Sequence, residues 1–118
     1  EKAISNLNQA LNIWKLLGND ANIAVIYNEL GSTYRNINNY TLALENFQQA
    51  LQIRRNIADI QQIAATLNNI GTIYKDINMT ETALEYYEEA LKIHQNLSND
   101  ALIALSLNYI GGVYYKKG

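Results

Sequence analysis

Apolar side chains recur along the chain at intervals of three and four residues, the spacing that places them on one side of an α-helix. The pattern predicts helices at about residues 2–17, 20–37, 40–57, 60–77, 80–97 and 100–118. None of the 118 residues is proline, which removes a hydrogen bond and clashes with the preceding turn inside a helix. The sequence therefore predicts an all-α protein of about six long helices.

Short polar segments separate these helices. Gly18 can adopt the left-handed conformation that ends a helix, and Asn19 or Asp20 can accept a hydrogen bond from the first turn of the next one. Asn38 and Asn78 stand at equivalent breaks forty residues apart, and asparagine is, after glycine, the residue that most readily enters the left-handed region. We expect helices to end at these three positions.

One segment occurs three times, at residues 24–34, 64–74 and 104–114, so the chain repeats with a period of forty residues. Each copy has alanine first, asparagine fifth, glycine eighth and tyrosine eleventh. The period predicts a half-repeat at residues 1–19, full repeats at 20–59 and 60–99, and a half-repeat at 100–118. We therefore expect a single repeat-built domain that is a piece of a longer solenoid.

The residues that recur resemble those of the tetratricopeptide repeat, a pair of helices with Leu-Gly-x-x-Tyr on the first and Ala-x-x-x-Phe-x-x-Ala on the second. The tryptophan of that family is replaced here by Tyr27, Leu67 and Leu107. The longer period resembles the repeats of kinesin light chains and spindle-orientation adaptors. The matching residues are Leu30, Gly31, Tyr34, Ala43, Phe47 and Ala50, then Ile70, Gly71, Tyr74, Ala83, Tyr87 and Ala90, then Ile110, Gly111 and Tyr114.

The resemblance implies a right-handed superhelical solenoid of antiparallel helix pairs. Gly31 and Ala43 would let the two helices of a pair approach closely, and Phe47 or Tyr87 would fill the wedge between one pair and the next. The first helix of each pair would line a concave groove that accepts a peptide or a segment of a partner protein.

The family's groove positions give the candidate binding residues of this chain. The fifth position of each first helix is an asparagine, whose amide could pair with a peptide backbone or could instead bond to neighbouring helices and fix their stacking. Where some relatives bind a free carboxylate, only Asn69 matches, so that kind of clamp is absent. The candidate groove residues are Asn28, Ser32, Arg35, Ala65, Asn68, Asn69, Thr72, Lys75, Leu105, Asn108 and Tyr109.

These features predict a non-catalytic protein-interaction module whose partner is a protein or peptide. The alternative function is a structural spacer or self-association arm that stacks through its terminal helices. Apolar residues near both ends support that alternative, namely Leu7, Leu11 and Trp14 and, at the other end, Leu107, Ile110, Tyr114 and Tyr115.

Composition narrows the possible functions further. A net charge of −2 and a pI near 5.3 argue against a nucleic-acid partner, and no apolar run is long enough to span a membrane. The chain has no cysteine, which excludes disulfides and thiolate metal sites and fits a cytoplasmic location. His94, the only histidine, is expected on the surface or at a helix dipole, and Glu85, Glu88 and Glu89 on a solvated face. We expect neither a metal nor a cofactor.

Overall fold

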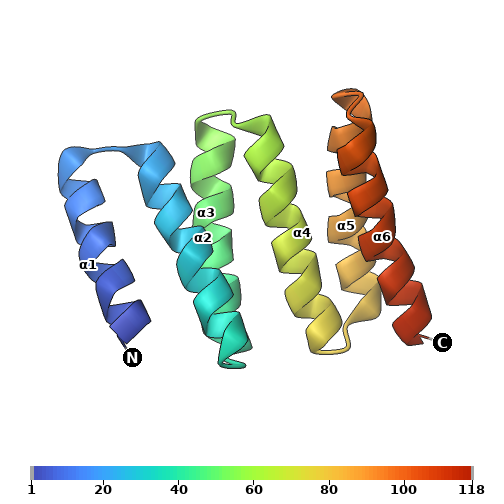
Figure 1. The fold of residues 1–118 in the computed structure, drawn as a ribbon, viewed down its shortest axis with the longest axis horizontal. Coiled ribbons are helices and arrows are strands. Elements are labelled where there is room, and N and C mark those ends of the chain that lie inside the picture. Colours follow the sequence, from blue (N-terminus) through green and yellow to red (C-terminus); the bar gives the residue numbers. More distant parts are fainter. Residues whose placement is uncertain (1, 118) are drawn as a thin grey trace. The chain divides into compact units, whose positions relative to one another are not determined.

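The computed structural model describes residues 2–117, which form six α-helices joined by short connections (Figure 1). Within these residues there is no strand, so the prediction of an all-α fold is confirmed. The predicted helix boundaries agree with the observed ones to within about a residue. The helices are α1 (Lys2–Leu17), α2 (Asp20–Asn36), α3 (Tyr40–Asn56), α4 (Ile60–Asp76), α5 (Thr80–Asn96) and α6 (Asp100–Lys117).

Each connection contains one residue with a positive φ. Gly18, Asn38 and Asn78, which the sequence marks as helix breakers, have φ values of 69°, 63° and 66°. Ala58 and Ser98 take the same conformation at the other two connections, although neither residue type favours it. The connection geometry is therefore a property of the repeat, and it holds even where the sequence has no glycine or asparagine.

Asparagine side chains begin three of the helices. The Oδ1 atom of Asn19 accepts a hydrogen bond from the backbone N–H of Asn22 at 3.0 Å, which shows that Asn19 rather than Asp20 caps α2. Asn39 and Asn99 make the same bond at the starts of α3 and α6. These caps satisfy N–H groups that have no partner within the helix.

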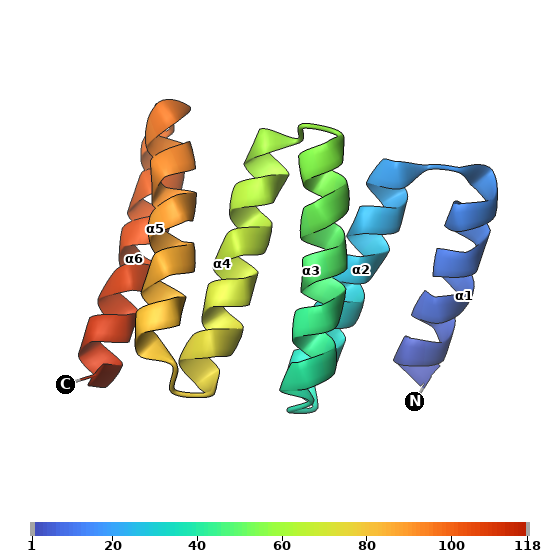
Figure 2. The same cartoon turned by 180° about the vertical axis from the view of Figure 1, so that it is seen from behind.

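The chain divides into two compact units, Glu1–Asp59 and Ile60–Gly118. In the first unit α2 packs against both α1 and α3, and in the second α5 packs against both α4 and α6 (Figure 2). Helices α4 and α6 also contact each other. The middle helix of the first unit is thus the first helix of a repeat, whereas the middle helix of the second unit is the second helix of a repeat.

Each unit has its own apolar core. In the first, Leu11 of α1 packs with Ile23, Ile26 and Leu30 of α2, and Trp14 lies at the edge of this cluster. In the second, Ala83, Leu84 and Tyr87 of α5 pack with Val113 of α6. The residues that form these cores are mostly those that recur with the forty-residue period.

Two of the repeated glycines, Gly31 and Gly71, lie directly beneath aromatic rings. A Cβ atom built on Gly31 would stand 2.7 Å from the ring of Phe47, and one built on Gly71 would stand 2.8 Å from the ring of Tyr87. The close approach expected at these glycines is therefore present, with the ring filling the space that a side chain would take. Tyr87 also stacks on Tyr109 of α6, with ring centroids 5.2 Å apart, so it contacts two helix pairs as expected of a wedge residue.

Candidate functional site

The candidate residues of the first unit lie on α2. Ser32 is exposed, while Asn28 and Arg35 are half-buried. Their spacing of three and four residues places all three along one side of the helix. This side of α2 therefore carries an amide, a hydroxyl and a guanidinium.

The candidate residues of the second unit lie on α4 and α6, two helices in contact. On α4, Ala65 is exposed and Asn69, Thr72 and Lys75 are half-buried. On α6, Leu105 and Asn108 are exposed and Tyr109 is half-buried. The two stripes make a surface of mixed apolar and polar character, which we call the α4–α6 face.

The three asparagines at the fifth position of each first helix have different environments. Asn28 is half-buried, Asn108 is exposed, and Asn68 is buried with only 4 % of its surface exposed. The sequence left two roles open for these asparagines, ligand binding and packing between helices, and Asn68 lies among the buried residues of its unit. The Oδ1 atom of Asn68 nevertheless has no hydrogen-bond partner among the described residues.

Tyr87 holds two of the candidate residues in place. The hydroxyl oxygen of Thr72 lies 3.0 Å from the backbone oxygen of Asn68 and 2.7 Å from the hydroxyl of Tyr87. Both bonds form when Thr72 donates to Asn68 and Tyr87 donates to Thr72. Tyr87 also stacks on Tyr109. The sequence could have indicated this role, because position 87 is a tyrosine whereas the equivalent position of the preceding repeat is Phe47, which has no hydroxyl.

Lys75 extends from α4 toward α6. Its Nζ atom lies 3.9 Å from the place where a Cβ on Gly112 would stand. An alanine at position 112 would therefore stand at ordinary van der Waals distance from the ammonium group. Gly112 stands at the repeat position of Ser32 and Thr72, which the family resemblance places in the groove, although it is not one of the candidate binding residues.

His94 differs from the prediction of a surface or helix-dipole residue. It is buried, its Nδ1 atom has no hydrogen-bond partner among the described residues, and burial lowers its pKa. A neutral imidazole in this position cannot supply the positive charge that a helix C-terminus attracts. The residue forty positions earlier, Arg54, is buried too, so this position of the repeat faces the interior in both units.

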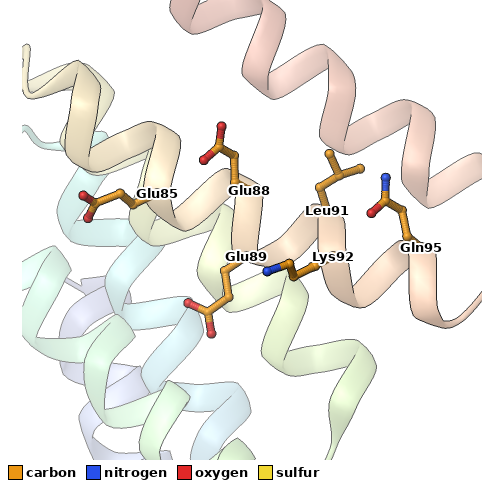
Figure 3. Close-up of a pocket in the computed structure, with 6 residues that line it drawn as sticks. All are labelled: Glu85, Glu88, Glu89, Leu91, Lys92 and Gln95. Atoms are coloured by element: carbon orange, nitrogen blue, oxygen red, sulfur yellow. The ribbon is translucent and has the colours of Figure 1, made fainter.

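The acidic residues of α5 lie on an exposed face of that helix, as predicted. Glu85, Glu88 and Glu89 are all exposed, and together with Leu91, Lys92 and Gln95 they line a shallow hollow formed by α5 alone (Figure 3). Among the described residues no group of histidine, aspartate or glutamate side chains is arranged to hold a metal ion. This surface has the character of a solvated helix face.

Comparison with known proteins agrees with the forty-residue pattern. The tetratricopeptide-repeat family matches residues 1–56 and 62–118, two segments that together include nearly all of the chain. The chain belongs to the tetratricopeptide-repeat family. Proteins of this family generally act by binding other proteins, which supports a function in protein interaction.

The fold is also found in a solved structure. The crystal structure of BtubC (BKLC) from P. vanneervenii matches with a TM-score of 0.86 and 25 % sequence identity. The match includes 97 % of this chain and 48 % of that one, so the chain spans about half the length of the protein it resembles. No curated protein sequence matches the chain significantly.

Among the residues that the structure describes, no helix has both the length and the apolar character needed to cross a lipid bilayer.

Proposed function

We propose that the chain binds an extended segment of a partner protein through the first helices of its repeats and has no catalytic activity. In the first unit the binding residues are Asn28, Ser32 and Arg35 of α2. In the second unit they lie on the α4–α6 face. Family membership supports protein binding in general, and the residues of these stripes support the particular surface.

The observation that carries the proposal is the unpartnered acceptor of Asn68. A buried polar atom without a hydrogen bond costs about 1–3 kcal/mol, so natural proteins retain few of them. Asn68 lies between Ala65 and Thr72 on the same stripe of α4, and Thr72 is anchored to Tyr87. The oxygen is covered in the unbound chain, so a backbone N–H of a bound peptide would satisfy it only where binding displaces the side chains that cover it.

The charges near this stripe suggest which ligands bind best. Lys75 lies next to α6, and Arg35 occupies the equivalent position on α2. Each would attract a carboxylate, and a cation near a hydrogen-bonding surface gives specificity more than affinity. The proposed ligand is therefore an extended peptide with acidic side chains.

The test starts from a binding peptide selected from a random library on the immobilised protein. Asn68→Ala should weaken binding of that peptide about three- to tenfold, the loss of one hydrogen bond of roughly 0.5–1.5 kcal/mol. The matched control is Asn46→Ala on α3, because the Asn46 amide bonds within its own helix to the backbone oxygen of Leu42. This control should leave the affinity unchanged.

Asn68 also tests the competing interpretation, in which the asparagines fix the packing of helices. A packing role predicts that Asn68→Ala lowers the midpoint of urea unfolding sharply while the affinity for the peptide stays the same. That result would overturn the proposed binding role of Asn68.

A second candidate function is self-association through the terminal helices. The observation that favours it is the exposure of large apolar side chains on α6, where Leu107, Tyr114 and Tyr115 have 52 %, 56 % and 89 % of their surface exposed. Apolar residues grouped on one helix are typical of surfaces that contact another protein.

A further inference from the structure

The contact between α5 and α6 carries two polar residues where the matching contact of the first unit is apolar. Trp14 of α1 packs against an apolar cluster that includes Ile26 of α2. His94 and Ser106 stand eighty residues after Trp14 and Ile26, at the same positions of the repeat. Because α5 packs against α6 as α1 packs against α2, His94 and Ser106 occupy the corresponding places of the α5–α6 contact (Figure 2).

Both polar groups are buried without a hydrogen bond. His94 is 2 % exposed and Ser106 is fully buried, and neither Nδ1 of His94 nor Oγ of Ser106 has a partner among the described residues. The hydroxyl of Thr66, which holds the position of Ser106 in α4, donates instead to the backbone oxygen of Gln62. Buried polar groups without partners weaken a contact that apolar residues would stabilise. The α5–α6 contact is therefore held less firmly at this point than the α1–α2 contact.

The helices around His94 offer no charge that could balance a proton on its ring. Residues 60–73 of α4 and 101–108 of α6 include no ionisable side chain, and Lys75 and Asp76 lie at the end of α4 that is next to the start of α5. The tyrosines of the three helices are neutral at neutral pH and below. The charged residues nearest to His94 along α5 and α6 are all exposed, namely Glu88, Glu89, Lys92 and Asp100.

Burial accordingly lowers the pKa of His94, and no neighbouring charge offsets the effect. A proton on the buried ring creates a cation without a counterion, which is strongly unfavourable until water reaches the ring. Opening the α5–α6 contact admits that water. Acid therefore favours the open contact over the closed one.

We propose that the α5–α6 contact is a pH-sensitive joint, at which a proton taken up by His94 separates α6 from α5 and so takes apart the α4–α6 face. The inference rests on the proposed function, and it adds regulation of peptide binding by pH. The matching contact of the first unit has no such response, because Trp14 and Ile26 do not titrate.

The α4–α6 face depends on this joint because α6 supplies part of the face. Leu105 is the residue before Ser106, and Tyr109 stacks on Tyr87 of α5 with ring centroids 5.2 Å apart. The backbone N–H of Asn99 donates to the backbone oxygen of His94 at 3.3 Å, which joins the start of α6 to the residue that titrates. When α6 leaves α5, its candidate residues no longer stand beside those of α4.

The first experiment measures the affinity of the selected peptide at about pH 7.5 and about pH 5.5, a range over which histidine titrates. Fluorescence anisotropy of the labelled peptide gives the dissociation constant. The constant should rise about threefold or more at the lower pH, because the apparent affinity falls with the fraction of chains whose face is intact. Aspartate and glutamate in the peptide stay charged at both values, since their ordinary pKa is about 4.

Two variants test whether the buried histidine is the cause. His94→Gln should bind the peptide at neutral pH and lose the change in affinity, because glutamine does not titrate. The matched control combines His94→Gln with Gln95→His, which moves the histidine to the next, exposed position of α5, and it should lose the change as well. Circular dichroism at neutral pH shows that each variant folds. A change in affinity that either folded variant retains would overturn the joint.

The second experiment follows the joint in the chain with its native His94 and without a ligand. The chain has no cysteine, so pairs of spin labels can be attached at chosen positions. Labels at Glu85→Cys of α5 and Tyr114→Cys of α6, both exposed sites, should show longer and broader distances at the lower pH. Labels at Glu85→Cys and at Gln62→Cys of α4 are the control and should show the same distances at both pH values.

The two experiments separate the joint from the proposed function. Distances between α5 and α6 that do not change with pH overturn the joint, whether or not a peptide binds. Distances that lengthen at the lower pH, in a chain that binds no peptide at neutral pH, support the joint and overturn the proposed function.

Discussion

The α2–α3 and α4–α5 pairs share their packing and differ in their polar chemistry. In both, a glycine of the first helix lies 2.7–2.8 Å, measured from a built Cβ, below a ring of the second. The ring on α3 belongs to Phe47. Ser32, the residue after Gly31, is exposed. The ring of α5 is Tyr87, whose hydroxyl lies 2.7 Å from that of Thr72, the counterpart of Ser32.

The difference shows how a repeat can keep its shape while its surface acquires a function. Glycine and a ring are sufficient for packing, so the hydroxyls of Tyr87 and Thr72 are additional. They connect the core of the second unit to its candidate binding surface, because Tyr87 fixes both Thr72 and Tyr109. A ligand bound at the α4–α6 face, as proposed, would therefore meet side chains that are already positioned, which lowers the entropy lost on binding.

Substitutions at the glycine–ring contact, which the two helix pairs share, should have the largest effects on stability. Gly71→Val is expected to destabilise the chain by about 1–3 kcal/mol, because the new side chain overlaps the buried ring of Tyr87. Gly71→Ala should also destabilise it, since a single Cβ already stands 2.8 Å from a ring atom. Urea unfolding followed by circular dichroism measures both changes.

Gly111→Ala is the control for this prediction, because nothing lies within 4 Å of its Cβ position. Measured at a concentration too low for association, it should stabilise the chain by up to about 1 kcal/mol through helix propensity. If Gly71→Ala and Gly111→Ala had equal effects, the ring contact would not be the reason for the glycine.

Loss of the hydrogen bond between Tyr87 and Thr72, by which the α4–α5 pair differs from the α2–α3 pair, should have a smaller effect on stability. Tyr87→Phe removes the hydrogen bond to Thr72 and is expected to cost roughly 0.5–1.5 kcal/mol in urea unfolding. It should also weaken binding of a selected peptide, because Thr72 loses its anchor. A double-mutant cycle with Thr72→Val isolates the bond, and additive losses from the two substitutions would show that they do not interact.

The fold followed from the sequence because it depends on spacing. Apolar periodicity and the positions of Gly18, Asn38 and Asn78 determine where helices begin and end, and these features are local. The left-handed conformations of Ala58 and Ser98 could not be predicted from those residues alone. There the helix packing on both sides of the connection outweighs the local preference.

The candidate site was less predictable because the repeat is not exact. Asn28, Asn68 and Asn108 occupy one position of the pattern, yet one is half-buried, one buried and one exposed. Burial depends on which helices surround a residue, and neighbours differ from repeat to repeat. His94 was misplaced on the surface for the same reason, since a polar residue at the end of a helix gives no sign of what covers it.

A substitution of His94 is expected to have the smallest effect on stability at neutral pH. Its pKa in the folded chain is lowered by burial, while in the unfolded chain it stays near the ordinary value of about 6.5. Above that value the imidazole is neutral in both states and stability does not depend on it. As the pH falls below about 6.5, His94 takes up a proton in the unfolded chain before it does so in the folded chain. The folded chain therefore loses stability as the pH falls from about 6.5 to the lower pKa that His94 has in the folded chain.

The equivalent position in the first unit explains why this response belongs to the second unit alone. Arg54 stands where His94 does, and its backbone oxygen accepts a bond from Asp59, as that of His94 does from Asn99. Burial lowers the pKa of Arg54 and the charge of Asp59 raises it, but arginine stays protonated throughout the accessible range. Urea unfolding at a series of pH values should therefore show a loss of stability below about pH 6.5 that His94→Gln reduces. An unchanged pH profile in His94→Gln would mean that other groups, most of them carboxylates, produce the acid sensitivity.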